Sequence, residues 1–280
     1  MINLIMTILC STAIALILKH NDTKKGNELV LLMGNYFIAS IITVIMIIAD
    51  KEFIYSAPTF VFGLLLGALF VYAFFAFAKA VSAAGTPLAS LSSRLSVVIP
   101  VFLSVLVYNE VPDLSDVTGF IFALATIILF YFSLKSNKER NLSLMDYLYL
   151  FILLLGIGLN DFFMKVFQQS RPAVEKSFFL FTIFTSAFVY TAVVVFIRKI
   201  KIRVRDFTLG NVLGVPNVFS SFFLIGALNA LPGIVVYPVV NIGIILLTTI
   251  LAIIIWKEKV DKYGTWALIA GIIAIALLNI

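Results

Sequence analysis

Apolar runs separated by short polar connections extend along the whole 280-residue chain. An α-helix rises 1.5 Å per residue, so roughly 20 apolar residues cross the hydrocarbon core of a bilayer, which is about 30 Å thick. The apolar runs recur at about that length, which predicts ten membrane-spanning helices. Their expected bounds are 2–18, 29–49, 57–78, 86–108, 117–134, 147–168, 177–197, 208–228, 233–256 and 263–280.

The runs are unbroken, as in IILLTTILAIIIW at 244–256, whereas a transmembrane β-strand would alternate apolar and polar residues over about ten positions. Hydrophobic residues make up 62% of the chain and charged residues 12%, a balance that excludes a soluble globular domain. The first run has no basic start and no small-residue cleavage site, so we expect it to stay in the mature protein. The predicted fold class is an all-α integral membrane protein.

Basic residues are unevenly distributed among the connections between predicted spans. Counted from the N-terminus, the odd-numbered connections hold fifteen Lys and Arg residues, whereas the even-numbered ones hold only Lys51, Arg171 and Lys176. The protein is predicted to lie in a bacterial plasma membrane. Because basic connections face the cytoplasm, both chain termini are predicted to lie on the other side of that membrane. The net charge of +6 is therefore an orientation signal and does not indicate nucleic-acid binding. The single cysteine, Cys10, excludes an internal disulfide, and no metal site or cofactor is predicted.

The two halves of the chain follow one plan. The polar stretch 135–145, a predicted cytoplasmic linker, separates residues 1–134 from residues 146–280, and each side carries five predicted spans. An odd number of spans makes the second half enter the membrane from the opposite side, so the two repeats would be inverted. In inverted-repeat transporters the substrate site lies between the repeats near the midplane of the bilayer.

A shift of 148 positions aligns the halves, superposing Gly85 on Gly233 and Glu110 on Glu258. In each half a small-residue segment precedes the glycine, and a long span ends at the glutamate within YNEVPDLSDVTG or WKEKVDKYGTWA. Together with the ten-span plan, these segments resemble the drug/metabolite transporter superfamily, specifically its EamA-type members. The resemblance covers nearly the whole chain and implies a secondary transporter. Both glutamates lie at span ends, where a solvated or helix-capping role is expected.

Three ionisable residues, Arg94, Asp161 and Lys165, lie within predicted spans. A charge there costs roughly 2.5–3.5 kcal/mol on insertion scales and therefore indicates a function or a partner. Asp161 and Lys165 are four residues apart on one helical face, so either they pair while the lysine extends to the interface, or Asp161 faces a cavity. In straight spans Arg94 and Asp161 would differ in depth by roughly 8 Å, a gap that a polar solute could bridge. The alternative for Arg94 is a guanidinium bound to backbone carbonyls at a helix break.

Uncharged polar residues gather on the spans that the resemblance places around the cavity. In GVPNVFSSFF and YPVVNIG, proline and asparagine occur together within a span, where proline leaves backbone carbonyls without a donor. Such residues also hydrogen-bond helices to one another, an alternative that applies to each of them singly. The predicted substrate-binding residues are Asn35, Tyr36, Tyr72, Ser90, Ser93, Arg94, Asn160, Asp161, Asn217, Ser220, Ser221, Tyr237 and Asn241.

These features predict a secondary transporter, an exporter or facilitator, for a small organic solute such as an amino acid or related metabolite, working by alternating access. Arg94 would bind a solute carboxylate, and Asp161 is the candidate proton carrier, because a carboxylate screened from water binds a proton more readily. The sequence contains neither a Walker-type GxxxxGK[ST] motif nor an enzyme motif within the spans. The expected partners are a small-molecule substrate and the lipid bilayer, with proton coupling. The alternative function is a lipid or lipid-linked sugar flippase.

Overall fold

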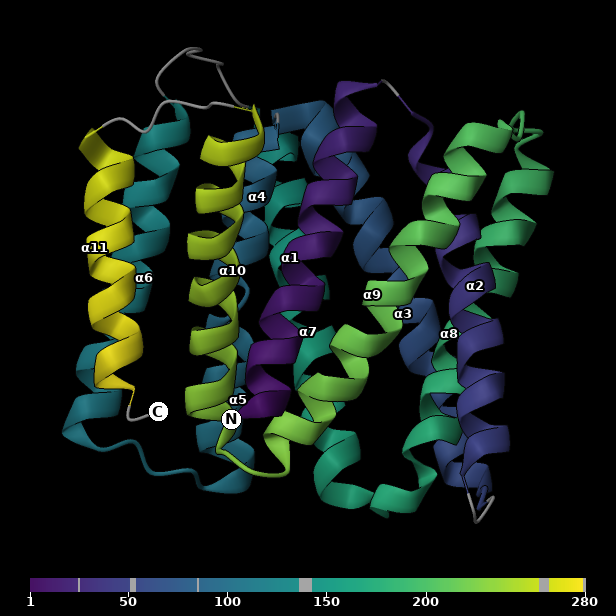
Figure 1. Ribbon diagram of the computed structural model, residues 1–280, viewed down its shortest axis with the longest axis horizontal. Coiled ribbons are helices and arrows are strands. Elements are labelled where there is room, and N and C mark those ends of the chain that lie inside the picture. Colours follow the sequence, from purple (N-terminus) through teal and green to yellow (C-terminus); the bar gives the residue numbers. More distant parts are fainter. Residues whose placement is uncertain (25, 51–53, 85, 136–142, 257–261, 279–280) are drawn as a thin grey trace. The chain divides into compact units, whose positions relative to one another are not determined.

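The protein is helical throughout the part of the chain that its computed structural model describes (Figure 1). That part comprises residues 1–24, 26–50, 54–84, 86–135, 143–256 and 262–278, and no strand occurs in it. The predicted all-α fold class is therefore confirmed. Gly85, Glu258 and most of the predicted linker lie outside the described residues, as does the side chain of Ser90 within its helix.

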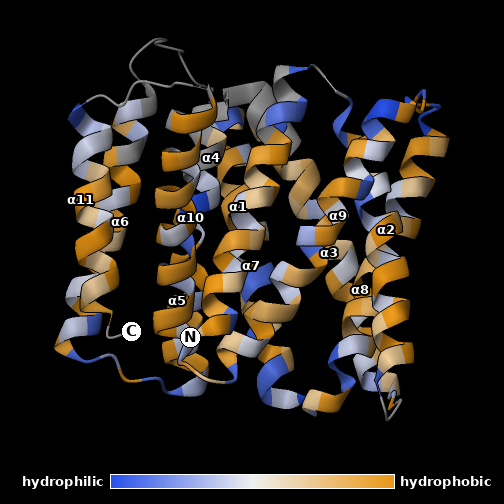
Figure 2. Cartoon of the chain, viewed as in Figure 1, coloured by the Kyte–Doolittle hydropathy of each residue, from blue (hydrophilic) through white to orange (hydrophobic). Residues whose placement is uncertain are grey.

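Within the described residues, seven helices are long and apolar enough to cross a membrane, as judged by length and composition. Three shorter apolar helical segments also occur, at Ile2–Leu18, Ser92–Tyr108 and Lys262–Leu277. Figure 2 shows apolar residues along most of each helix and hydrophilic residues mainly toward the helix ends. The chain is therefore a multi-pass membrane protein, whereas the count of ten spans stays a prediction.

The chain divides into two compact units, and each unit takes segments from both halves of the sequence. Unit 1 contains Met1, Ala73–Phe162 and Ala227–Ile280. Unit 2 contains Ile2–Tyr72 and Phe163–Gly226. Helices α3 (Ala57–Ala84) and α7 (Leu144–Ser170) contribute to both units.

Unit 2 is built around helix α2, which contacts α8 extensively along its length. Its complete elements are α1 (Ile2–Thr23), α2 (Glu28–Ala49), η1 (Ala173–Glu175) and α8 (Lys176–Ile197), joined by nearly all of α9 (Val204–Leu228). Asn27 caps the start of α2, because its Oδ1 atom accepts hydrogen bonds from the N–H groups of Leu29 and Val30, at 3.0 and 3.2 Å. Asp206 of α9 in turn accepts the Asn27 N–H at 2.9 Å, so the two helix starts are held together.

Unit 1 contains the helix pair α6 and α11, which pack closely against each other. Its complete helices are α4 (Thr86–Leu95), α5 (Val98–Tyr108), α6 (Leu114–Lys135), α10 (Gly233–Trp256) and α11 (Lys262–Leu277). Helix α10 packs against α5, α6 and α11, and is therefore central to the unit. Its residues Tyr237, Val239 and Ile242 are at most 1% exposed.

The predicted span 86–108 is not one helix, because α4 ends at Leu95 and α5 starts at Val98. Pro100 has no N–H to donate to the Ser96 carbonyl, so a regular helical hydrogen bond is impossible at that point. The Ile99 N–H binds the Ser96 carbonyl instead, at 3.0 Å, in a tighter turn. Arg94 consequently lies in the last turn of α4, directly before the break.

Corresponding helices of the two sequence halves share the offset found in the sequence. Helix α8 begins and ends 148 residues after α2, and α11 begins 148 residues after α6. In unit 2, α2 and α8 pack together and run in opposite directions (Figure 1). In unit 1, α6 and α11 do the same. Each of these helices therefore has its counterpart in the other half as a packing partner.

Glu110 caps the start of α10, which confirms one of the two roles expected for it. Its carboxylate oxygens accept the N–H groups of Gly233 and Ile234, each at 3.0 Å.

We predict that Glu110→Gln, which loses the charge facing these N–H groups, lowers the free energy of unfolding by about 1 kcal/mol. SDS-induced unfolding followed by circular dichroism measures this change. Asp50→Asn, which neutralises an exposed acid at another connection, serves as the control, and an equal loss in both variants would contradict the capping role.

Candidate functional site

The predicted substrate-binding residues fall into two groups, one in each compact unit. The side chains described in unit 1 are Ser93, Arg94, Asn160, Asp161, Tyr237 and Asn241. Those in unit 2 are Asn35, Tyr36, Tyr72, Asn217, Ser220 and Ser221. The two groups differ in whether their polar atoms already form hydrogen bonds within the protein. Atoms that already form such bonds hold helices together, and the others are candidates for contacts with a ligand.

In unit 1, the opposite charges of Arg94 and Asp161 lie close enough to attract each other. Both side chains are partly buried, Arg94 at the end of α4 and Asp161 in α7. Lys165, the partner expected from helical spacing, is 1% exposed and therefore does not extend to the surface. A positive charge that acts on Asp161 therefore comes from another helix, at the point where α4 ends.

Tyr237 joins α10 to α7 beside Asp161. Its hydroxyl donates to the backbone carbonyl of Asp161 at 2.8 Å, and its side chain is 1% exposed. Asn241, one turn further along α10, donates from Nδ2 to the Tyr237 carbonyl at 3.1 Å. Pro238 lies between them and has no N–H to donate to the Ile234 carbonyl one turn earlier, so a regular helical hydrogen bond cannot form at that point.

Asn160 contributes a buried hydrogen-bond acceptor to the group in unit 1. In the part of the chain that the structure describes, its Oδ1 atom is buried and receives no hydrogen bond. An unsatisfied buried acceptor costs about 1–3 kcal/mol, so its retention requires an explanation. Asn160 directly precedes Asp161 in α7. An acceptor without a donor and an acid are therefore adjacent in a span.

In unit 2, three of the candidate residues bind other residues of the protein. Asn217 donates from Nδ2 to Oδ1 of Asn35 at 3.1 Å, which joins α9 to α2. The hydroxyls of Ser220 and Ser11 are 2.7 Å apart, which joins α9 to α1. Ser11 was not among the predicted substrate-binding residues, although a serine within an apolar span was the available signal. These contacts match the alternative in which polar residues hold helices together.

The remaining candidates of unit 2 differ in exposure. Tyr36 is 3% exposed and packs near Phe184, with ring centroids 6.4 Å apart. Ser221 is 7% exposed, whereas Tyr72 in α3 is 53% exposed. Tyr36 and Ser221 therefore belong to the interior of unit 2, and Tyr72 is the accessible member of this group.

A further polar cluster, which the sequence analysis missed, joins the start of α3 to the connection between α7 and α8. Glu175 is 3% exposed and lies 3.0 Å from Nη2 of Arg171. Ser56 and Thr59 both donate to the Glu175 carboxylate, and Arg171 donates from Nε to the Thr59 hydroxyl at 2.8 Å. The available signal was the spacing of four residues between a basic and an acidic residue in RPAVE.

Comparisons with known proteins agree with the resemblance found in the sequence. Residues 1–132 match the family described as the EamA-like transporter family. An uncharacterized protein of Haemophilus influenzae is 28% identical, over 99% of this chain and 97% of its own. A solved crystal structure is 15% identical with a TM-score of 0.80, covering 99% of this chain and 95% of its own, and this likeness concerns the fold alone. The first part of the chain, residues 1–132, is thus similar to the EamA-like transporter family of the drug/metabolite transporter superfamily.

Proposed function

We propose that this protein is a secondary transporter for a small solute that carries both a carboxylate and an ammonium group, such as an amino acid or a related metabolite. The proposal is carried by the opposite charges of Arg94 and Asp161, which belong to separate helices of unit 1 and attract each other. The match of residues 1–132 to the EamA-like transporter family supports a membrane transporter, and this pair supports the class of solute.

The chemistry of the group in unit 1 suits a zwitterionic solute. A guanidinium binds a carboxylate through two parallel hydrogen bonds, which Arg94 can provide. Asp161 and the unsatisfied Oδ1 of Asn160 are acceptors for an ammonium group, which carries three donors. Without a solute, the attraction between Arg94 and Asp161 offsets part of the cost of keeping both charges in a span.

The matching helix bounds support two inverted repeats, each with five spans, which alternate between inward and outward openings. In this scheme the solute gradient or coupled protons supply the energy, and Asp161 carries the proton. The charge bias of the connections supports a bacterial plasma-membrane location with the odd-numbered connections in the cytoplasm.

We predict that Arg94→Gln lowers the rate of amino-acid counterflow in proteoliposomes by about tenfold or more, because it removes charge-assisted hydrogen bonds worth about 1.5–3 kcal/mol. A panel of labelled amino acids identifies the solute in the wild-type protein first. Asp146→Asn is the control, because it changes the charge by one unit in the first turn of α7, fifteen residues before Asp161, and it should transport normally. Normal transport by Arg94→Gln would contradict the assigned site.

Two further measurements in the same vesicles test proton coupling through Asp161 and, separately, solute transport against lipid flipping. Asp161→Asn should remove the dependence of transport on a pH gradient, and an unchanged dependence would exclude Asp161 as the proton carrier. Lipid scrambling is measured beside solute uptake in the wild-type protein. Scrambling without uptake of any zwitterionic solute would favour the alternative, a lipid or lipid-linked sugar flippase, and would overturn the proposed function.

A further inference from the structure

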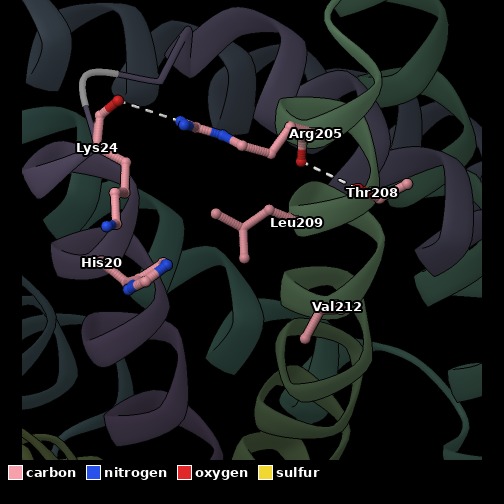
Figure 3. Close-up of a pocket in the computed structure, with 6 residues that line it drawn as sticks. All are labelled: His20, Lys24, Arg205, Thr208, Leu209 and Val212. Atoms are coloured by element: carbon pink, nitrogen blue, oxygen red, sulfur yellow. Dashed lines mark hydrogen bonds between the residues drawn. The ribbon is translucent and has the colours of Figure 1, made fainter.

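A cleft in unit 2 opens between the end of α1 and the start of α9. It has a volume of about 500 Å³, and Figure 3 shows the six side chains that line it. They are His20, Lys24, Arg205, Thr208, Leu209 and Val212. The connections from α1 to α2 and from α8 to α9 meet here, because Arg205 donates from Nη2 to the Lys24 carbonyl at 3.2 Å.

The polar end of the cleft is positively charged. Lys24 and Arg205 are both exposed, and the six lining residues include no carboxylate. Asp206, the nearest acid along the chain, is 0% exposed, accepts a hydrogen bond from the Asn27 N–H and forms an ion pair with Arg205 at 3.2 Å, so Lys24 supplies the net positive charge. Arg205 is therefore held in place from two sides, yet its side chain is 55% exposed and has five N–H donors.

The inner end of the cleft is apolar. Leu209 and Val212 follow Arg205 by four and seven residues in α9, so the three side chains lie on one face of the helix. By the helical rise, Val212 lies roughly 10 Å further along the axis than Arg205. Val212 is 56% exposed, although its part of α9 belongs to an apolar span. A ligand that fills this cleft would need an anionic head and an apolar tail.

We propose that the cleft binds an anionic phospholipid, with the phosphate of the headgroup between Lys24 and Arg205 and an acyl chain along Leu209 and Val212. Basic residues at the cytoplasmic end of spans attract anionic lipids, with about 1 kcal/mol for each Lys or Arg near the surface. The cleft lies at connections one and seven, which the charge bias places on that side. The inference concerns a lipid site and does not depend on which solute is transported.

The test titrates delipidated, detergent-solubilised protein with phosphatidylglycerol or with phosphatidylcholine of the same acyl chains, and native mass spectrometry counts the bound lipids. We expect the wild-type protein to bind phosphatidylglycerol more tightly than phosphatidylcholine. Lys24→Gln should weaken phosphatidylglycerol binding about fivefold, the effect of one lost surface charge. Lys201→Gln is the matched control, because it removes an exposed lysine from the same end of unit 2 but outside the cleft, and it should bind normally.

Two additional arms distinguish the lipid from a free anion. Val212→Ser should weaken phosphatidylglycerol binding, because it removes apolar contact with the acyl chain. Inorganic phosphate at millimolar concentration should fail to displace the lipid. Displacement by phosphate would overturn the proposal in favour of a simple anion site, and equal phosphatidylglycerol binding by Lys24→Gln and the wild-type protein would overturn the site itself. Both substituted residues are exposed, so the variants should fold, and their unfolding in lipid-free detergent checks this.

Discussion

Gly210→Ala should destabilise the protein by about 3 kcal/mol, although alanine is the better helix former. A Cβ atom at Gly210 would overlap the backbone carbonyl oxygen of Leu31 in α2 and would lie 2.9 Å from the backbone nitrogen of Asn35. Backbone atoms of a neighbouring helix cannot rotate away as a side chain can. The two helices would therefore have to separate, and the buried contacts between them would be lost.

Two further glycines at the contact between α2 and α9 lead to the same expectation. Cβ atoms at Gly34 and Gly214 would likewise overlap backbone carbonyl oxygens, those of Phe207 and Asn35. Three glycines thus allow the two backbones to approach, as small residues do in membrane helix pairs generally. The hydrogen bond from Asn217 to Asn35 lies at the same contact, so separating the helices would break it as well.

SDS-induced unfolding followed by circular dichroism gives the free energy of unfolding of each variant. Gly271→Ala is the matched control, because its Cβ would meet side-chain atoms of Ile242 and Leu246, each at 3.0 Å, which can adjust. The control should change stability by less than about 1 kcal/mol. If both alanine variants were equally stable, the close approach of α2 and α9 would be wrong.

Glu175→Ala should have the second-largest effect, a loss of about 2–3 kcal/mol. Breaking a buried ion pair on one side typically costs 3–5 kcal/mol, and the lower figure applies here because the Arg171 side chain is 23% exposed and keeps some contact with water. The substitution also removes the acceptor for the hydroxyls of Ser56 and Thr59. The start of α3 would then lose its connection to the segment before α8.

A double-mutant cycle with Arg171→Met isolates the pairwise part of this loss. The coupling energy between residues 171 and 175 should exceed about 1 kcal/mol, the upper range of surface pairs. Transport by Glu175→Ala, measured at a temperature where the variant stays folded, should remain normal, because the cluster is separate from the proposed solute site. A coupling energy near zero would show that the cluster adds nothing to stability.

The hydrogen bonds between helices also limit where a solute can bind. In unit 2 the polar groups of Asn35, Asn217 and Ser220 bind one another or Ser11. A solute that used them would have to break those contacts first. Among the predicted substrate-binding residues that the structure describes, Asn160 in unit 1 keeps a buried acceptor without a donor, directly before Asp161. The proposed site therefore lies in unit 1.

Apart from the predicted span 86–108, which is two helices, the amino-acid sequence was sufficient to predict the bounds of the helices to within six residues. The reason is that a bilayer of fixed thickness requires apolar segments of a fixed length, which can be counted along the chain. The 148-residue offset was also visible, and α8 repeats the bounds of α2 at that offset. The break before Pro100 entered only as an alternative for Arg94 and not in the predicted span 86–108, because proline is tolerated within membrane helices wherever neighbouring groups satisfy the freed carbonyls.

The pairing of polar residues depended on the tertiary structure. Lipid is as apolar as a protein interior, so spans are apolar on all faces and their sequence does not indicate which face packs against which helix. Asn35 and Asn217 are 182 positions apart, and only the approach of α2 to α9 makes them partners. Likewise, Arg94 comes near Asp161, and Glu175 becomes buried, only because helices distant in sequence lie side by side within each unit.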